Sequence, residues 1–200
     1  MLLMTDIHVR SFTGSGIKSH LHSIAKLRTS ALQDYPYSEA PNLQREMEHI
    51  RHISTCKEAI IVLIFDGHTL VGSALGYPLV WAAAELLKPF RDQGRKVESY
   101  FFFGESMLLK LYRGRGIGHH FFDAREAHVT HFATFQHICF CVPYKTEEKA
   151  PADFIPLNEF YRRRGYIHHP ELAFHQIKHK VGQQTPVEVV DTFWIKEIHR

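Results

Sequence analysis

The stretch from 107 to 122 places three glycines and several basic side chains directly after a short apolar run. The apolar run, Met107–Leu111, predicts a buried strand. The glycines are Gly114, Gly116 and Gly118. Because glycine lacks a side chain, backbone N–H groups here can approach a ligand closely, and a following helix would aim its free N–H groups and positive dipole end at the same place. The pattern therefore predicts an anion site, most typically one for phosphate.

The order of the glycines excludes two common phosphate motifs. The chain contains no Gly-x-x-x-x-Gly-Lys-Ser/Thr, which a nucleotide P-loop requires. A dinucleotide motif, Gly-x-Gly-x-x-Gly, fails at its last position, which is His119 when it starts at Gly114 and Phe121 when it starts at Gly116. What fits is Arg-x-x-Gly-x-Gly over Arg113–Gly118. The alternative is a strand-to-helix turn that needs glycine for its backbone conformation alone.

This pattern, after a strand and before a helix, resembles the acetyl-CoA signature of the GCN5-related N-acetyltransferases, the GNAT superfamily. In that family the loop holds the pyrophosphate of coenzyme A. The resemblance therefore implies acetyl-CoA or coenzyme A as a co-substrate. The residues implied to bind it are Leu108, Leu109, Lys110, Arg113, Gly114, Arg115, Gly116, Ile117, Gly118, His119 and, further along the chain, Asn158.

A second stretch, from Asn158 to Tyr166, resembles the Phe-Tyr-x-x-x-Gly-Phe/Tyr pattern of the same family. The resemblance implies that Tyr161 protonates the leaving coenzyme A thiolate, and a phenol of pKa ~10 is a usable acid toward such a thiolate. The sequence departs from the family where an asparagine usually stands, because that position holds Phe154. The alternative is that Tyr161 only packs, together with Leu157 and Phe160.

A protonated amine must lose a proton before it attacks a thioester, so we expect a general base. Glu105 is the nearest carboxylate before the glycine turn, at a place where GNAT members often carry a glutamate. Glu98 is the second candidate. The alternative for Glu105 is a buried carboxylate paired with a basic or hydroxyl neighbour. A backbone N–H near Leu108 is expected to hold the developing oxyanion.

The remaining composition bounds the class of protein. A formal net charge of +3 does not predict nucleic-acid binding. No apolar run approaches ~20 residues, and Met1–Met4 is too short for a signal sequence, so we expect a cytoplasmic protein without a membrane span. Three cysteines argue against a disulfide framework. The sixteen histidines form no metal-binding spacing, so we expect no metal and scattered surface histidines.

The elements that must position these residues follow from periodicity and turn signals. Strands are expected over 6–12, 59–65, 69–77, 97–112, 136–142, 166–178 and 187–198, and helices over 17–32, 42–56, 116–132 and 156–165. Asp66-Gly67 predicts a hairpin turn. Gly72, Gly76 and Gly104 mark expected bulges. This order resembles that of the GNAT fold. The resemblance implies an α/β (α+β) single domain over 1–200, with a central mixed, mostly antiparallel seven-stranded sheet and about four helices.

Residues 79–96 have no counterpart in the minimal order of strands and helices of that fold. They predict a small insertion between the third and fourth strands. A short helix is expected before Pro89, and a polar loop after it. Three roles stay open: a cover over the acceptor site, a subunit contact in a homodimer, or a surface excursion.

The function implied is transfer of an acyl group from acetyl-CoA to a primary amine by direct attack. No Ser-His-Asp or Cys-His arrangement calls for a covalent intermediate. The alternative is a coenzyme A-binding sensor or interaction module without turnover. The sequence does not identify the acceptor.

Overall fold

The computed structural model describes residues 6–35, 40–144, 150–152, 154–182 and 184–199. Its contacts group the chain into two compact units. The first contains Met1–Leu32, Pro41–Tyr77 and Phe103–His131, and the second contains Gln33–Ala40, Pro78–Phe102 and Phe132–Arg200. β4 has residues in both units, and β3 ends with one residue, Pro78, in the second. A single domain over 1–200 stays a prediction.

The chain forms an open seven-stranded sheet with the order β1-β2-β3-β4-β5-β7-β6. The strands are β1 (Ile7–Thr13), β2 (Ile60–Asp66), β3 (Thr69–Pro78), β4 (Tyr100–Leu108), β5 (His137–Pro143), β6 (Ile167–Lys178) and β7 (Val187–Glu197). β4 and β5 pair in parallel, whereas β1–β2, β2–β3, β5–β7 and β6–β7 pair antiparallel. The predicted mixed, mostly antiparallel sheet is confirmed.

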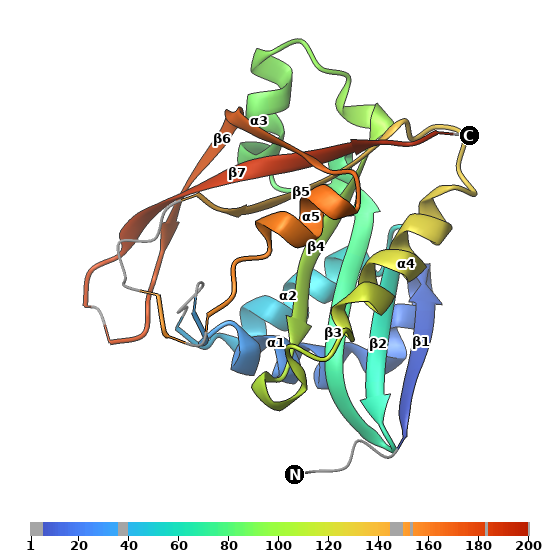
Figure 1. Cartoon of the computed structure of the whole chain (residues 1–200), viewed down its shortest axis with the longest axis vertical. Helices are drawn as coiled ribbons and strands as arrows, with labels where there is room; N and C mark the ends of the chain where they lie inside the picture. Colours follow the sequence, from blue (N-terminus) through green and yellow to red (C-terminus); the bar gives the residue numbers. More distant parts are fainter. Residues whose placement is uncertain (1–5, 36–39, 145–149, 153, 183, 200) are drawn as a thin grey trace. The chain divides into compact units, whose positions relative to one another are not determined.

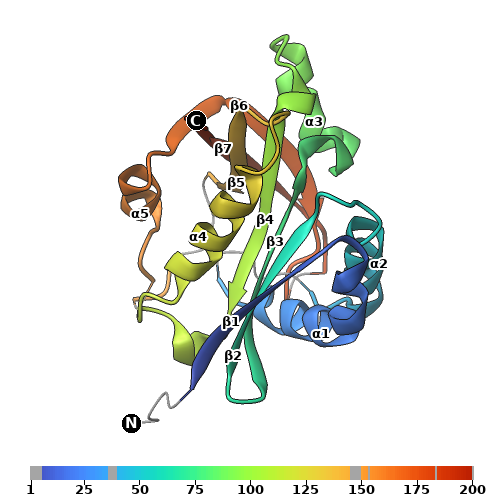
Figure 2. The same ribbon diagram turned by 90° about the vertical axis from the view of Figure 1, so that its right-hand side faces the viewer.

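In the first unit, helices cover both faces of the sheet. The helices are α1 (Leu21–Ala31), α2 (Leu43–Ile53) and α4 (Gly118–Val129). α1 and α2 lie on one face of β1–β3, and α4 lies on the opposite face (Figures 1 and 2). β2 is therefore covered on both sides, which explains its continuous apolar run and the complete burial of Ile61 to Ile64. Asn42 caps α2 by accepting a hydrogen bond from the Arg45 N–H, as the expected start of that helix requires.

In the second unit, β5, β7 and β6 carry α3 (Ala84–Asp92) and α5 (Asn158–Arg163). α3, which falls in the predicted insertion, packs against β6. Its Phe90 is fully buried, with its ring centroid 4.9 Å from Tyr100 and 4.8 Å from Phe193. The helix is thus part of this unit's core and not a surface excursion. Pro89 lies inside α3 and not beyond it, because burial of Leu87 and Phe90 offsets the hydrogen bond that proline cannot make.

All four predicted helices are shorter in the structure than the sequence suggested, and α1 and α4 show why. Residues Gly14–His20 form a 3₁₀ helix, and α1 begins only at Leu21. α4 begins at Gly118 and ends at Val129, inside the expected range of 116–132. The positive φ of Gly116 (+77°) explains the later start of α4, since a left-handed residue cannot belong to the helix.

The predicted fourth strand, 97–112, is wrong at both ends. Val97–Ser99 and Lys110–Tyr112 are 3₁₀ turns. After β4 the N–H of Leu109 still donates to the carbonyl of Val71 at 3.0 Å, and the chain then turns away. Leu111, which extended the apolar pattern of the strand, is 69% exposed. The apolar run was therefore misleading, because one of its leucines faces water.

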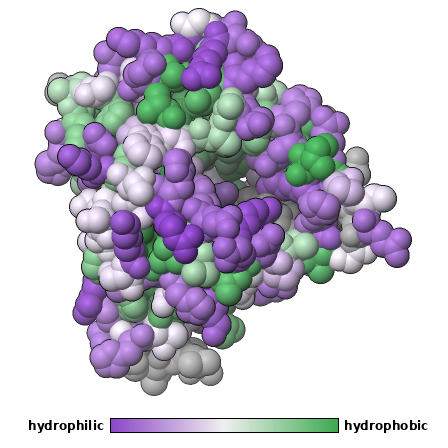
Figure 3. All heavy atoms as spheres, turned by 180° about the vertical axis from the view of Figure 1, so that it is seen from behind, coloured by the Kyte–Doolittle hydropathy of each residue, from purple (hydrophilic) through white to green (hydrophobic). Residues whose placement is uncertain are grey.

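On the face that Figure 3 shows, polar residues predominate and apolar residues occur in small separate groups. Among the described residues, no helix combines the length and the apolar character needed to cross a membrane.

The pairing of β2 with β3 shifts next to a glycine. Ile64 pairs with Gly72 and Phe65 with Leu70, so β3 has one extra residue at this point. A bulge near Gly72 is confirmed, whereas Gly76 pairs with Ile60 in the regular register. A Cβ on Gly72 would lie 2.8 Å from the ring of Phe121 and 2.9 Å from Leu108. α4 and β4 therefore approach β3 so closely here that only glycine fits.

We predict that Gly72→Ala lowers the free energy of unfolding by about 1–3 kcal/mol, the usual range for overpacking. Gly16→Ala is the matched control, because its Cβ would meet nothing closer than 3.9 Å. The control should stay within about 0.5 kcal/mol of the wild type. Chemical denaturation measures both variants, and equal stabilities would contradict the close contact at Gly72.

Candidate active site in the first unit

The glycine turn leaves open space beside its backbone. Gly114 and Gly116 have φ values of +72° and +77°, a conformation that side chains with a Cβ rarely adopt. A Cβ placed on Gly114, Gly116 or Gly118 would meet no atom within 4 Å. The turn therefore needs glycine for its conformation at 114 and 116, and a ligand can approach the backbone at all three positions.

The turn is anchored to β4 and to the β2–β3 hairpin. The Nε of Arg113 donates to the carbonyl of Leu108 at 2.9 Å. The hydroxyl of Tyr112 donates to the carboxylate of Asp66 at 2.9 Å, and this bond raises the pKa of Tyr112. Other basic side chains around the turn are exposed: Lys110, Arg115 and His119. An anion at the start of α4 would thus meet backbone N–H groups and positive charge on a fixed support.

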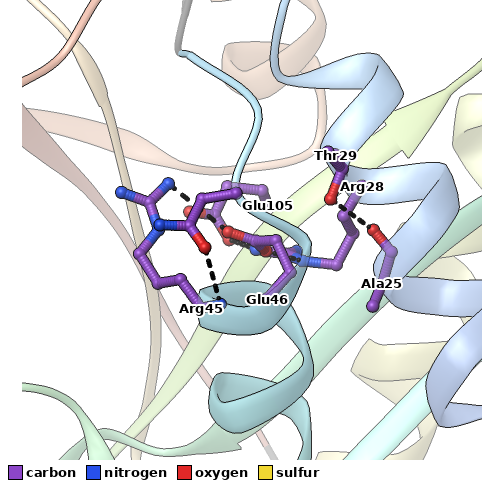
Figure 4. Close-up of polar contacts among 7 residues, drawn as sticks. Ala25, Arg28, Thr29, Arg45, Glu46 and Glu105 are labelled. Carbon is purple, nitrogen blue, oxygen red and sulfur yellow. Dashed lines mark hydrogen bonds and ion pairs between the residues drawn. The ribbon is translucent and has the colours of Figure 1, made fainter.

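The structure pairs Glu105 with a buried arginine. Arg28, on α1, donates from Nη2 to Glu105 Oε2 at 3.1 Å and from Nε to Glu46 Oε2 at 2.7 Å (Figure 4). The side chains of Arg28 and Glu46 are 3% and 5% exposed, whereas that of Glu105 is 41% exposed. Burial opposes the charge on Arg28, but the two carboxylates outweigh burial and raise the pKa of Arg28.

This pairing matches the alternative that the sequence left open for Glu105. The guanidinium stabilises the ionised carboxylate. The same stabilisation makes the carboxylate a weaker base, while its partial exposure leaves it open to solvent, so the role of Glu105 as base remains a prediction. The second candidate, Glu98, lies in the 3₁₀ turn before β4 and is exposed, not on the strand as expected.

His49 is a titratable residue near this cluster that the sequence reasoning missed. Its ring centroid lies 6.2 Å from that of Tyr77, edge to face. Burial, with a further contribution from the charge of Arg28, lowers the pKa of His49. The imidazole is therefore neutral at neutral pH and can accept a proton. Its spacing from Glu46, one helical turn along α2, was the signal that could have revealed it.

The oxyanion donor expected near Leu108 remains a prediction. Leu108 is the last residue of β4. The next N–H, that of Leu109, already donates to the carbonyl of Val71, so it is committed to the sheet.

Tyr161 belongs to the second unit. It lies on α5, is 8% exposed, and has its ring 4.7 Å from Phe140 and 5.3 Å from Trp194. Phe160 contacts the same ring, but Leu157, expected to pack beside it, is 52% exposed. Gly165 ends the helix with a φ of +84°, as predicted. The proton-donor role of Tyr161 remains a prediction.

Asn158 is the first residue of α5 and is exposed, while Pro156 lies before the helix and not in its first turn. Of the residues expected to bind the cofactor, only Asn158 lies in the second unit. Its contact with coenzyme A remains a prediction.

The cysteines are not poised as nucleophiles. All three are free thiols. Burial raises the pKa of Cys56 to about 11 and also raises that of Cys139. Within the described part of the chain, no group of three or more His, Cys, Asp or Glu side chains is arranged to hold a metal ion.

Three solved structures illustrate what the chain is similar to. NAA60 from Arabidopsis thaliana in complex with acetyl-CoA has a TM-score of 0.63, 12% identity, and coverage of 96% of this chain and 99% of that one. For ribosomal-protein-alanine N-acetyltransferase from Brucella melitensis, the TM-score is 0.62 and the identity 13%, with coverage of 96% and 99%. For the GNAT-family acetyltransferase from Streptococcus pneumoniae, the TM-score is 0.60 and the identity 11%, with coverage of 96% and 100%.

This chain has the GNAT fold. The similarity extends over 96% of this chain in each of the three comparisons. No protein-family model matches the sequence, and no curated protein matches it. The GNAT fold is thus recognised here from structure, at identities that carry no function by themselves.

We predict that acid destabilises the protein partly through His49. Because the pKa of His49 is lowered in the folded state, the unfolded chain binds more protons below about pH 6.5, and stability falls as the pH falls. His49→Gln should reduce this loss, measured by chemical denaturation at about pH 7.5 and 5.5. His22→Gln, at an exposed position on α1, is the matched control. Equal losses in wild type and His49→Gln would contradict the assignment.

Proposed function

We propose that the protein is an acyl-CoA-dependent N-acyltransferase that transfers an acetyl group from acetyl-CoA to a primary amine. The observation that carries this proposal is the open glycine turn between the end of β4 and the start of α4. It offers backbone N–H groups, a helix N-terminus and basic side chains to a pyrophosphate. The GNAT fold adds support, since NAA60 was crystallised with acetyl-CoA.

In this proposal the coenzyme A pyrophosphate binds at Gly114 to Gly118, with Arg113, Arg115 and Lys110 supplying positive charge around it. Leu108, Leu109, Ile117 and His119 flank the same turn. When bound, acetyl-CoA supplies the thioester that is attacked. The residues of the turn bind and orient it.

The reaction is a direct displacement. The amine nitrogen attacks the thioester carbonyl carbon, a C–N bond forms, and the C–S bond breaks. The amine loses one proton to a base, and the departing thiolate gains one proton from an acid. Glu105 is the proposed base because it is partly exposed and lies on β4, the strand that ends at the glycine turn, and His49 is a neutral second proton acceptor close to it. Tyr161 is the proposed acid. Because burial raises the pKa of the Cys56 and Cys139 thiols, a covalent cysteine intermediate has no support.

A coenzyme A-binding sensor without turnover is the second candidate. A sensor would bind coenzyme A at the same turn, so only the residues that would bind and deprotonate an amine distinguish the two functions. The Glu105 carboxylate is bound by the buried Arg28 and is partly exposed to solvent. This arrangement favours an enzyme, because a sensor does not need a proton acceptor at this place.

We predict that Gly116→Val weakens acetyl-CoA binding at least about 100-fold, equivalent to the loss of two charge-assisted hydrogen bonds. Valine at a φ of +77° must distort the turn and would fill the space beside its backbone. Gly94→Val is the matched control, because Gly94 has a φ of +65°, equally open surroundings and no place in the turn. Calorimetry gives both affinities. Wild-type affinity in a folded Gly116→Val protein would contradict the proposed cofactor site.

We predict that Tyr161→Phe lowers kcat by about 100-fold while acetyl-CoA affinity stays unchanged. kcat and kcat/KM should fall together, because the proton is donated only in the transition state. The basic limb of the pH–rate profile should shift or disappear.

Tyr166→Phe is the matched control for packing, because Tyr166 is also buried and its ring lies 5.0 Å from Phe140. Wild-type turnover by Tyr161→Phe would exclude the acid role. If neither the wild type nor Tyr161→Phe turned over any amine while both bound acetyl-CoA, the sensor would be favoured.

A further inference from the structure

Arg125 is a fully buried arginine in the middle of α4. Its Nε donates to the carbonyl of Phe121 at 3.0 Å, within the same helix. Its Nη1 donates to the carbonyls of Leu75 on β3 and Gly104 on β4, at 2.9 and 3.1 Å. Its Nη2 donates to the hydroxyl of Ser106 on β4 at 2.8 Å. One side chain thus joins α4 to two strands.

Burying a guanidinium is costly, because removing an arginine from water costs free energy that its hydrogen bonds repay only in part. The guanidinium also lies 4.2 Å above the ring of Phe103. The hydrogen bonds described above show what this buried side chain holds in place.

Arg125 holds the two residues on either side of Glu105. Side chains alternate along a strand, so Gly104 and Ser106 face α4 while Glu105 faces the opposite side. On that opposite side Arg28 binds the Glu105 carboxylate. Figure 2 shows α4 and α1 on the two faces of this part of the sheet. Two buried arginines therefore bind three consecutive residues of β4. Arg125 binds the carbonyl of Gly104 and the hydroxyl of Ser106, and Arg28 binds the carboxylate of Glu105.

We propose that Arg125 is a positioning residue for the acyl transfer. It fixes β4 at Gly104 and Ser106, and so it fixes the direction in which the Glu105 side chain leaves the strand between them. This inference rests on the proposed function. It also links the candidate base to α4, the helix that begins at the cofactor turn. The hydrogen bond to Ser106 can be removed with little disturbance of the core, because the Ser106 side chain is exposed.

The test is a double-mutant cycle on the full chain with acetyl-CoA and a good amine. Ser106→Ala removes the acceptor of Nη2 and should lower kcat about tenfold, the value of one charge-assisted hydrogen bond, with KM for acetyl-CoA within about twofold of wild type. In a Glu105→Gln background the same substitution should change kcat by less than about twofold, because the group it positions is gone.

Two further variants separate positioning from general loss of structure. Ser106→Thr keeps the hydroxyl and should restore most of the activity. Ser99→Ala removes a comparable serine bond, from Oγ to the carbonyl of Lys96 just before β4, and should leave kcat and its dependence on Glu105 unchanged.

Effects of Ser106→Ala and Glu105→Gln that multiply would overturn the positioning role while leaving the transferase intact. Full activity in Ser106→Ala would overturn it as well. A wild type that binds acetyl-CoA but acetylates no amine would overturn the proposed function, and with it the role assigned to Arg125.

Discussion

A buried guanidinium has to find hydrogen-bond partners, and β4 supplies them on both of its faces. Arg28 is enclosed between α1 and α2 and binds carboxylates from α2 and β4. Arg125 reaches β4 from α4 and binds its backbone and a hydroxyl. Where water cannot take the place of a removed partner, the guanidinium is left uncompensated in the core, which is more costly than the contact itself is stabilising. The position of β4, and hence of the turn that follows it, depends on these two contacts.

The position of the glycine turn depends on the position of β4. It begins where β4 ends, and Arg113 and Tyr112 fasten it to Leu108 and to Asp66. Left-handed glycines then reverse the chain into α4, whose start faces the open space beside the turn. A cofactor site of this kind needs few side chains, because its donors are backbone groups.

Local signals in the sequence were enough to predict the sheet and the turn. Asp66-Gly67 specifies a hairpin through the positive φ of its glycine, and the unbroken apolar run before it specifies a strand covered on both faces. The ends of β4 were not predictable in this way, since Leu111 looks like a strand residue and is exposed.

The partners of Glu105 were also beyond the sequence. Arg28 and Glu46 lie far from Glu105 along the chain and have no motif in common with it. Only the packing of α1 and α2 on one face of the sheet brings these charges together, and the same packing lowers the pKa of His49. Sequence spacing can identify residues that act together within one helix or strand. A cluster whose members come from α1, α2 and β4 can be identified only when the fold is known.

The most direct test of the account is release of free coenzyme A thiol from acetyl-CoA across a panel of primary amines at pH above neutrality. The panel should include alkylamines, arylalkylamines, amino acid amides and short peptides with free N-termini. The account predicts thiol release that depends on one class of amine and yields its N-acetylated product in equal amount. Tight acetyl-CoA binding with no amine-dependent release over the whole panel would contradict the central claim that the protein is an acyltransferase.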